Sequence, residues 1–284
     1  MTNDTASTSS IGIIAGSGVL PFAVAESLKS KNIRPVIFAI RGFCDPSKVE
    51  GYKHHWVALG QFGRLAHLIR SEHCRDVVFI GGLVRPALSE IRLDFGTLRV
   101  IPAIAKAMRG GDDHLLTSIG RIFEQNGFRL RGIKDIAPEL LVPEGSITRE
   151  TPSVDALADI AKGRGLLNAI GPFDVGQAVV VIDGHVIAVE DIEGTDGLLS
   201  RVARLREAGR VRAKAGRGVL VKAPKPDQDR RVDLPTLGPK TIDGVVVAGL
   251  AGVAIVAGQT LIAEPELTIG QANKAGLFVT GLPA

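Results

Sequence analysis

Short apolar runs alternate with helical patterns in the first half of the chain. Three runs have the length of buried strands and lie at residues 11–15, 35–40 and 77–82. Apolar residues recur at helical spacing after the first run through Leu28, and again around residues 67–71 and over residues 101–127. Strands that alternate with helices predict βαβ units around a parallel sheet. We therefore expect an α/β fold for this half.

Residues that break helices and strands cluster in the middle of the chain. Three prolines and a glycine fall within residues 138–152. Runs of this kind are typical of exposed linkers between domains. We therefore place a first domain at residues 1–137, a linker at residues 138–152 and a second domain at residues 153–284.

The second domain is also expected to be mixed α/β. Two β-rich runs, residues 178–182 and 186–190, flank the dipeptide Asp183-Gly184, which is a strong hairpin signal. Helical patterns precede and follow the hairpin at residues 154–165 and 197–207, and apolar runs of strand character lie at residues 218–221 and 242–257. The end of the domain, residues 245–284, alternates strands and a short helix.

A charged run with three prolines occupies residues 222–238. Proline fixes φ and removes a backbone donor, so this run is predicted to be a rigid loop and not a helix or a central strand. Its carboxylates suit a divalent cation and its cations suit a phosphate, which are the two needs of diphosphate cleavage. A solvated loop without a function is the competing interpretation. The prolines and the apolar runs on both sides favour a site.

A second candidate site begins with Gly16, Ser17 and Gly18, which lie between a predicted strand and a predicted helix. Such a turn brings backbone N–H groups and a helix N-terminus to a phosphate. The third glycine of the dinucleotide fingerprint is missing, and Pro21 suits the first helical turn instead. The next strand ends at Arg41, where NAD binding would favour an acid. A mononucleotide pocket is therefore favoured over a redox site.

Two further groups of residues are candidates for ligand binding. Gly81, Gly82 and Arg85 lie at the carboxyl end of a predicted strand, where ligands of open α/β sheets bind, although a plain turn explains them equally well. Thr195 and Asp196 precede a predicted helix. Either residue can serve as the N-cap, and the same hydroxyl and carboxylate can also hold a phosphate or hydrated Mg²⁺.

Composition restricts the class of partner. The chain has 284 residues, 45% of them hydrophobic and 23% charged, with a formal net charge of +4, one Trp and one Tyr. A mild positive charge favours small anionic partners, and so few aromatic platforms argue against nucleic acid. Only Cys44 and Cys74 are present, and residues 1–10 lack the pattern of a secretory signal. We expect a cytoplasmic protein that is at most peripheral to a membrane.

Several short stretches spread over the chain carry recognisable motifs. They are Ile-Ala-Gly-Ser-Gly-Val-Leu-Pro at residues 14–21, Gly-Gln-Phe-Gly at 60–63, Arg-Pro at 85–86, Gly-Asp-Asp at 111–113, Asp-Val-Gly-Gln at 174–177, Glu-Gly-Thr-Asp at 193–196, and the charged loop with its Lys-Ala-Pro-Lys-Pro segment, Gln228 and its Arg-Val-Asp-Leu-Pro-Thr segment. Taken together, these stretches resemble the LpxI-type UDP-2,3-diacylglucosamine diphosphatases of lipid A biosynthesis. The resemblance runs over nearly the whole chain, and the last two stretches are its most specific motifs.

The resemblance implies a Rossmann-like N-terminal domain, a distinct C-terminal domain and Mg²⁺-dependent hydrolysis of UDP-2,3-diacylglucosamine to UMP and 2,3-diacylglucosamine 1-phosphate. The aspartate that matters for catalysis in the family corresponds to Asp233. We assign Asp233 and Asp196 to the metal or its water, and the UDP part to the turn at residues 16–18. The remaining catalytic candidates are Lys222, Lys225 and Arg231, which neutralise phosphate charge, and Gln228.

Two other functions remain open at the level of sequence. One is a non-catalytic carrier of a nucleotide-linked lipid with the same two domains, and the other is a redox enzyme. The expected partner is a lipid-linked UDP-sugar, met in transient contact with the surface of the inner membrane. Whether the chain is a monomer or a homodimer is left open.

Overall fold

The computed structural model describes residues 9–83, 94–98, 100, 112–225 and 228–284. The chain divides into two compact units. The N-terminal unit comprises Met1–Pro138 together with Arg231–Asp233, and the C-terminal unit comprises Glu139–Arg230 and Leu234–Ala284. Each unit has its own sheet and its own hydrophobic core, as the two-domain α/β prediction requires.

The sheet of the N-terminal unit is wholly parallel and has the order β3-β2-β1-β4-β5. β2 and then β3 are added on one side of β1, and the chain then returns to place β4 and β5 on the other side of β1. This order is that of a Rossmann-like sheet, with the reversal between β1 and β4. The strands are β1 (Ser10–Ala15), β2 (Arg34–Ile40), β3 (His54–Val57), β4 (Asp76–Ile80) and β5 (Arg129–Leu130).

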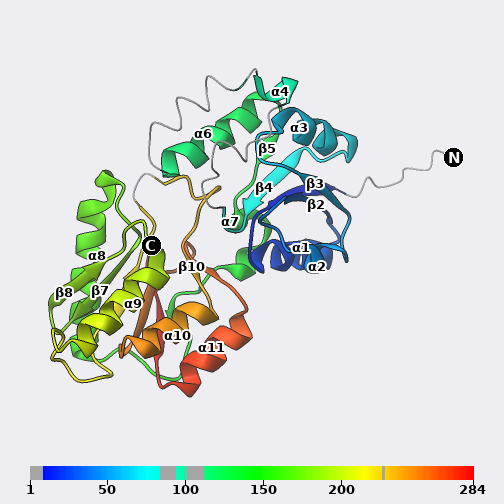
Figure 1. Cartoon of the computed structure of the whole chain (residues 1–284). Helices are drawn as coiled ribbons and strands as arrows, with labels where there is room; N and C mark the ends of the chain where they lie inside the picture. The colour runs from blue at the N-terminus through cyan, green and yellow to red at the C-terminus, as the bar shows by residue number, and fades with distance from the viewer. Residues whose placement is uncertain (1–8, 84–93, 99, 101–111, 226–227) are drawn as a thin grey trace. The chain divides into compact units, whose positions relative to one another are not determined.

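Helices cover both faces of this sheet (Figure 1). On one face α3 (Phe62–Ser71) and α6 (Asp112–Gln125) pack on a core that includes Phe38. On the other face α1 (Leu20–Ser30) lies along β1 and β2. Pro21 lies in the first turn of α1, as the sequence predicts. The remaining short helices are α2 (Pro46–Val49), α4 (Phe95–Leu98) and α7 (Ile133–Ile136).

Three residues from the charged loop complete the N-terminal unit. Val232 packs against the hydrophobic core of this unit, beside Ile119 of α6 and Leu130 of β5. Arg231 donates a hydrogen bond to Glu124 of α6 at 2.7 Å. The charged loop is therefore not a solvated excursion, because a short piece of it is part of a folded core.

The C-terminal unit contains a mixed six-stranded sheet of order β6-β13-β11-β9-β7-β8. Its centre, β9, β11 and β13, is parallel, whereas β6 and β7 run antiparallel to their neighbours. The strands are β6 (Gly145–Ser146), β7 (Ala178–Ile182), β8 (His185–Val189), β9 (Val219–Lys222), β11 (Gly252–Val256) and β13 (Phe278–Leu282); a separate parallel pair consists of β10 (Thr236–Leu237) and β12 (Leu261–Ile262).

Helices lie on both faces of this sheet (Figure 1), and alternate residues of the central strands pack against different helices. Val179 and Val181 of β7 point to α8 (Val154–Ile170), whereas Val180 and Ile182 point to the opposite face. A period of two is what a buried strand requires. The opposite face is covered by α9 (Gly194–Glu207), α10 (Pro239–Val247) and α11 (Pro265–Lys274).

The hairpin predicted around Asp183-Gly184 is confirmed as β7 and β8. The interpretation of residues 242–257 as one strand-like run is wrong in its first part, because residues 242–247 belong to α10 and only Gly252–Val256 is a strand. Pro239 after Gly238 is a helix-start signal that outweighs the β-branched composition. The segment expected to link the domains contains η2 (Pro138–Leu140) and β6, which pairs with β13.

None of the helices within the described ranges combines the length and the apolar character that a membrane crossing requires.

Candidate functional site

In the N-terminal unit, the two predicted glycine turns lie together at the carboxyl edge of the sheet. The backbone of Ser17 and the backbone of Gly82 exchange two hydrogen bonds, of 2.9 and 3.1 Å. The Ser17 hydroxyl also donates to the Gly82 carbonyl at 3.0 Å. These turns follow β1 and β4, between which the strand order reverses. That reversal is where ligands of open α/β sheets bind.

The crossing of the two turns depends on the absence of side chains. A Cβ atom on Gly16 would lie 2.5 Å from the Gly82 carbonyl oxygen, and one on Gly81 would lie 2.7 Å from the Ser17 carbonyl oxygen. Gly18 has a φ of +94°, a conformation that favours glycine. The turn leads directly into α1, where Pro21 has no N–H and the N–H groups of Phe22 and Ala23 both donate to the Val19 carbonyl. Backbone atoms therefore form most of this edge.

In the C-terminal unit, the predicted Lys222 lies at the carboxyl end of β9. Strand alternation places it on the same face as Leu220, the face that α9 covers. Lys222 is only 6% exposed, and its ammonium donates to the Thr195 hydroxyl at 2.9 Å and to the Thr236 carbonyl at 3.1 Å. One buried cation thus joins β9, the start of α9 and the end of the charged loop.

Glu190 is the buried acid of the same edge. It directly follows β8, which runs parallel to β9 through the antiparallel β7 between them. The side chain is 8% exposed, and its two oxygens accept hydrogen bonds from the Thr195 hydroxyl and from the Gln177 N–H, both at 2.6 Å. A buried carboxylate and a buried ammonium are therefore joined through one hydroxyl group.

Other predicted residues of the charged loop also lie at this edge. The Lys225 ammonium pairs with Asp174, which follows the short helix η3 (Gly171–Phe173). Gln228 is 7% exposed, and its side-chain oxygen accepts the N–H of Lys225 at 3.1 Å. Gln228 thus folds the start of the loop upon itself and holds the Lys225 backbone in place.

Thr195 and Asp196 take different positions from those of a cap. The N-cap of α9 is Glu193, without a side-chain capping bond, so the interpretation of Thr195 or Asp196 as the N-cap is wrong. The Thr195 hydroxyl is directed to Glu190 and Lys222 instead. Asp196 is half exposed and pairs with Lys240 at 2.6 Å, an ion pair that raises the pKa of Lys240 through its hydrogen bond.

The predicted site residues are divided between the two units. Arg231 and Asp233 belong to the N-terminal unit, as do the two glycine turns, whereas Thr195, Asp196, Lys222, Lys225 and Gln228 belong to the C-terminal unit. Arg85 lies outside the described residues. The glycine turns lie at the carboxyl edge of the N-terminal sheet, and Lys222 and Thr195 lie at the carboxyl edge of the C-terminal sheet, with Asp196 exposed beside Thr195. Arg231 lies instead against α6, where it pairs with Glu124.

Comparison with known proteins identifies the family. Residues 10–140 match the LpxI N-terminal domain, and residues 143–280 match the LpxI C-terminal domain. The chain belongs to the LpxI family. The resemblance drawn from the motifs is therefore confirmed.

A relative is known from Caulobacter vibrioides. It is called UDP-2,3-diacylglucosamine pyrophosphatase LpxI, is 41% identical over 272 residues, and the alignment covers 96% of this chain and 97% of the relative. A solved structure, the biotin carboxylase domain dimer of 2-oxoglutarate carboxylase from Hydrogenobacter thermophilus, matches with a TM-score of 0.22 and 14% identity over 71% of this chain and 41% of that chain. A match of that quality supports no conclusion.

Sequence reasoning missed Glu190 in this LpxI family member. The signal was present, because residues 186–190 were predicted as a strand that ends in an acid, three residues before the Glu-Gly-Thr-Asp motif. What no pattern reveals is that the acid is buried and lies beside Thr195. Asp174 stands out in the sequence only as the first residue of the Asp-Val-Gly-Gln motif. Its contact with Lys225 likewise depends on the tertiary fold.

Within the residues described for this LpxI chain, no group of three or more His, Cys, Asp or Glu side chains gathers in a way that would hold a metal ion. A site of fewer protein ligands is the usual arrangement for Mg²⁺, which is bound through one or two carboxylates together with substrate phosphates and water. Of the two predicted metal ligands, Asp233 belongs to the N-terminal unit and Asp196 to the C-terminal unit.

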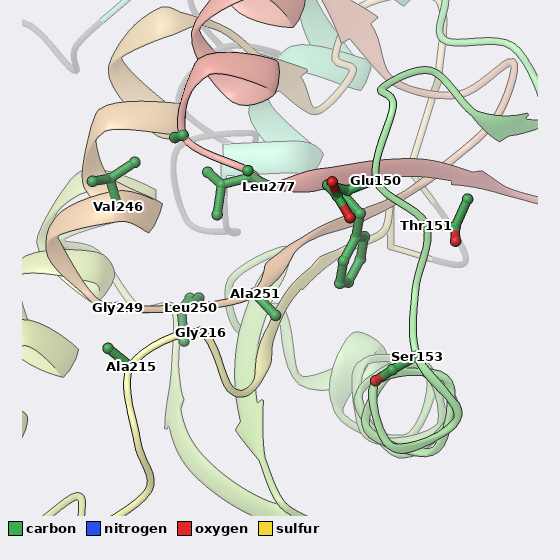
Figure 2. Close-up of a pocket in the computed structure, with 13 residues that line it drawn as sticks. Glu150, Thr151, Ser153, Ala215, Gly216, Val246, Gly249, Leu250, Ala251 and Leu277 are labelled. Atoms are coloured by element: carbon green, nitrogen blue, oxygen red, sulfur yellow. The ribbon is translucent and has the colours of Figure 1, made fainter.

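A cavity of about 360 Å³ lies elsewhere in the C-terminal unit of this LpxI chain. Figure 2 shows Val246 and Leu277 on one side of it and Glu150 and Ser153 on the other. Its lining includes residues just before β9, β11 and β13, so it lies at the amino edge of the sheet, opposite to Lys222. This cavity is therefore not part of the predicted site.

Proposed function

We propose that the protein hydrolyses UDP-2,3-diacylglucosamine to UMP and 2,3-diacylglucosamine 1-phosphate in lipid A biosynthesis. The observation that carries this proposal is the 41% identity, over almost the whole of both chains, to a relative named as the pyrophosphatase of that substrate. The cluster of buried polar groups around Lys222 supports it, because a buried cation at the edge of a sheet suits an anionic ligand.

The proposed reaction adds water across the diphosphate. A bond forms from the water oxygen to one of the two phosphorus atoms, and the bond from that phosphorus to the bridging oxygen breaks. The electron pair stays on the bridging oxygen, which leaves with the other phosphate, and the attacking water loses a proton to the solvent. Negative charge grows on the leaving oxygen, and in our proposal Lys222, Lys225 and Arg231 neutralise it.

The UDP part is proposed to bind at the carboxyl edge of the N-terminal sheet. Gly16, Ser17 and Gly18 lead into α1, and Gly81 and Gly82 pack against them without side chains. Backbone N–H groups at the start of a helix are a general means of holding phosphate. The remaining residues of the proposed substrate-binding set, also predicted from the sequence, are Arg85 and Thr195.

The proposed cofactor is Mg²⁺, held by Asp233 and Asp196. The residues fit such an ion, because both are carboxylates and Mg²⁺ needs only one or two of them beside phosphate and water. Asp196 is half exposed, and its partner among the described residues is the exposed Lys240, so it can exchange that partner for a cation. When bound, Mg²⁺ neutralises charge on the diphosphate and favours ionisation of a water molecule. Gln228 is proposed to keep Lys225 in place.

We also propose transient contact with the cytoplasmic surface of the inner membrane. Two long acyl chains contribute membrane affinity on the order of 15 kcal/mol, so the substrate stays at the bilayer. Two apolar side chains, Phe173 and Ile192, are 78% and 100% exposed. Phe173 is the last residue of η3, next to Asp174, and Ile192 lies in the turn two residues after Glu190. Replacing both with Ser should reduce binding to anionic vesicles in a flotation assay, whereas Val154→Ser, on α8, should not.

The test of the proposed function is release of UMP from UDP-2,3-diacylglucosamine in detergent micelles, with Mg²⁺ and then with excess EDTA. We expect UMP and the diacyl sugar phosphate in equal amounts with Mg²⁺ and neither with EDTA. Asp233→Ala should bind substrate without turnover, and Asp243→Ala, an exposed acid on α10, should behave as the wild type. Substrate binding without turnover by the folded wild type would instead indicate a carrier protein.

Hydrolysis in ¹⁸O-labelled water tests which phosphorus is attacked. Label in UMP supports attack on the uridine side. Label in the sugar phosphate would contradict it and leave the overall reaction unchanged.

A further inference from the structure

Glu190 is held in a single orientation although it lies outside every motif on which the predicted site was based. It is 8% exposed, and its Oε2 atom accepts the backbone N–H of Gln177 at 2.6 Å. That N–H belongs to the segment just before β7, so one carboxylate oxygen is fixed by the sheet. The other oxygen, Oε1, faces the Thr195 hydroxyl at 2.6 Å.

The direction of the hydrogen bonds follows from the chemistry of the three groups. An ammonium only donates, an ionised carboxylate only accepts, and a hydroxyl has one proton and two lone pairs. Thr195 must therefore donate its proton to Glu190 and accept from Lys222, whose ammonium lies 2.9 Å away. The chain of bonds runs from Lys222 through Thr195 to Glu190, and each member determines the orientation of the next.

Burial gives this chain its energetic importance. Lys222 is 6% exposed, and a buried cation is unfavourable unless a negative charge and hydrogen bonds compensate it. The Thr236 carbonyl supplies one bond without a charge. Glu190 supplies a negative charge, which the Thr195 hydroxyl links to the Lys222 ammonium at the end of β9.

We propose that Glu190 is a positioning residue for the hydrolysis, which holds the Lys222 ammonium in place for the substrate diphosphate through the hydroxyl of Thr195. The inference rests on the proposed function. Glu190 touches neither substrate nor metal in this scheme, and its effect on the reaction passes entirely through Thr195.

The amide Glu190→Gln breaks this chain without a change of size. Its single oxygen can accept from Gln177 or from Thr195, and its NH₂ group then faces the remaining donor. If the NH₂ group faces Thr195, the hydroxyl must turn its proton toward Lys222. Both the charge and the direction of the hydrogen bonds are lost. Thr195→Val removes the hydroxyl from the same chain, whereas Thr195→Ser keeps it.

Kinetics with the full-length protein test the proposal. We expect Glu190→Gln and Thr195→Val each to lower kcat about 100-fold, the size of effect that a small misplacement of a catalytic group produces, and Glu190→Gln to change KM less than threefold. The double variant should lose no more than either single variant, because the residues act in series. Thr195→Ser should recover activity to within a few-fold. The matched control is Asp191→Asn, an exposed neighbour whose carboxylate, within the part of the chain that the structure describes, accepts the N–H of Ile192.

A measurement without turnover separates this inference from the proposed function. The ¹⁵Nζ resonance of Lys222, assigned by its loss in Lys222→Arg, should shift or broaden in Glu190→Gln and in Thr195→Val and stay unchanged in Asp191→Asn. If the wild type releases no UMP but the resonance responds in this way, the function is wrong and the positioning contact stands.

The opposite result overturns the inference. A wild type that hydrolyses the substrate, with Glu190→Gln within threefold in kcat and the Lys222 resonance unchanged, would show that Glu190 only supports the fold. Additive losses in the double variant would lead to the same conclusion. Circular dichroism establishes that each variant is folded, and if Glu190→Gln is not, the pair Thr195→Val and Thr195→Ser decides the question.

Discussion

The two units present the same kind of sheet edge and build it from different material. At the carboxyl edge of the N-terminal sheet, Gly16, Ser17 and Gly82 meet through backbone atoms. At the carboxyl edge of the C-terminal sheet, Lys222 and Glu190 are buried side chains joined through a hydroxyl. A backbone edge offers shape and N–H groups, whereas a side-chain edge offers charge. The first suits holding a nucleotide, and the second suits stabilising a reaction.

The largest effect is expected at the charged edge. Lys222→Met keeps the aliphatic stem and removes the ammonium, so kcat should fall about 10²- to 10³-fold, as when one preorganised donor is lost from an active site. The assay is UMP release by folded protein. Lys162→Met is the control, because the Lys162 ammonium donates to the Gly184 carbonyl at the hairpin turn. An unchanged kcat in Lys222→Met would contradict a catalytic role for the carboxyl edge of the C-terminal sheet.

The backbone edge should respond to added volume. A methyl group on Gly16 would lie 2.5 Å from a carbonyl oxygen, so Gly16→Ala should force the two turns apart and reduce the free energy of unfolding by about 1–3 kcal/mol. Urea unfolding measures this loss, and KM for the substrate should rise with it. Gly51→Ala, where a methyl group meets open space, is the control and should be neutral. A neutral Gly16→Ala would contradict the close crossing.

The sequence predicts the N-terminal edge better than the C-terminal edge, and the reason is physical. Strand, glycine turn and helix are consecutive in the chain, so local pattern is enough to place Gly16 and Gly81 at strand ends. The hairpin at Asp183-Gly184 is local in the same way. By contrast, the pairing of Glu190 with Lys222 through Thr195 joins residues up to 32 positions apart and depends on which side chains are buried. No periodicity encodes that choice.

An ionic cluster at the amino edge of the N-terminal sheet provides a contrast to the two carboxyl edges. Burial alone would raise the pKa of Glu72, but hydrogen bonds from His55, Lys53 and Arg34 outweigh it and keep that pKa below its ordinary value of 4.5. This cluster lies at the edge away from the glycine turns. It should therefore matter for stability and not for turnover.

The sign of the pH dependence follows from the lowered pKa of Glu72. The folded protein favours the ionised carboxylate, so this contribution is complete above pH 4.5 and is lost as the pH falls through the folded pKa. Glu72→Gln should lower the free energy of unfolding by about 1 kcal/mol at pH 7 and by less at pH 3. Urea unfolding at the two pH values measures the difference, with the exposed Glu50→Gln as control. An equal loss of unfolding free energy at both pH values would contradict a lowered pKa of Glu72.

The smallest effect is expected for Ser17→Ala. The hydroxyl bond to the Gly82 carbonyl is lost, but the two backbone bonds between these residues remain, so the free energy of unfolding should fall by only about 0.5 kcal/mol. KM should change less than threefold. If Ser17→Ala instead abolishes binding of substrate, this edge works through a side chain after all and the contrast between the edges is wrong.

The short segment Arg231–Asp233 belongs to the N-terminal unit, although it comes late in the sequence, within the part of the chain that forms the C-terminal unit. The N-terminal unit is finished only when residue 233 has been synthesised, because Val232 fills a place in its core. A fragment that stops at residue 138 would emerge from the ribosome with that place empty. Genetic separation of the two domains would therefore need a permuted or doubled loop, and gene fusions that exchange one domain would have to carry these three residues with the other half.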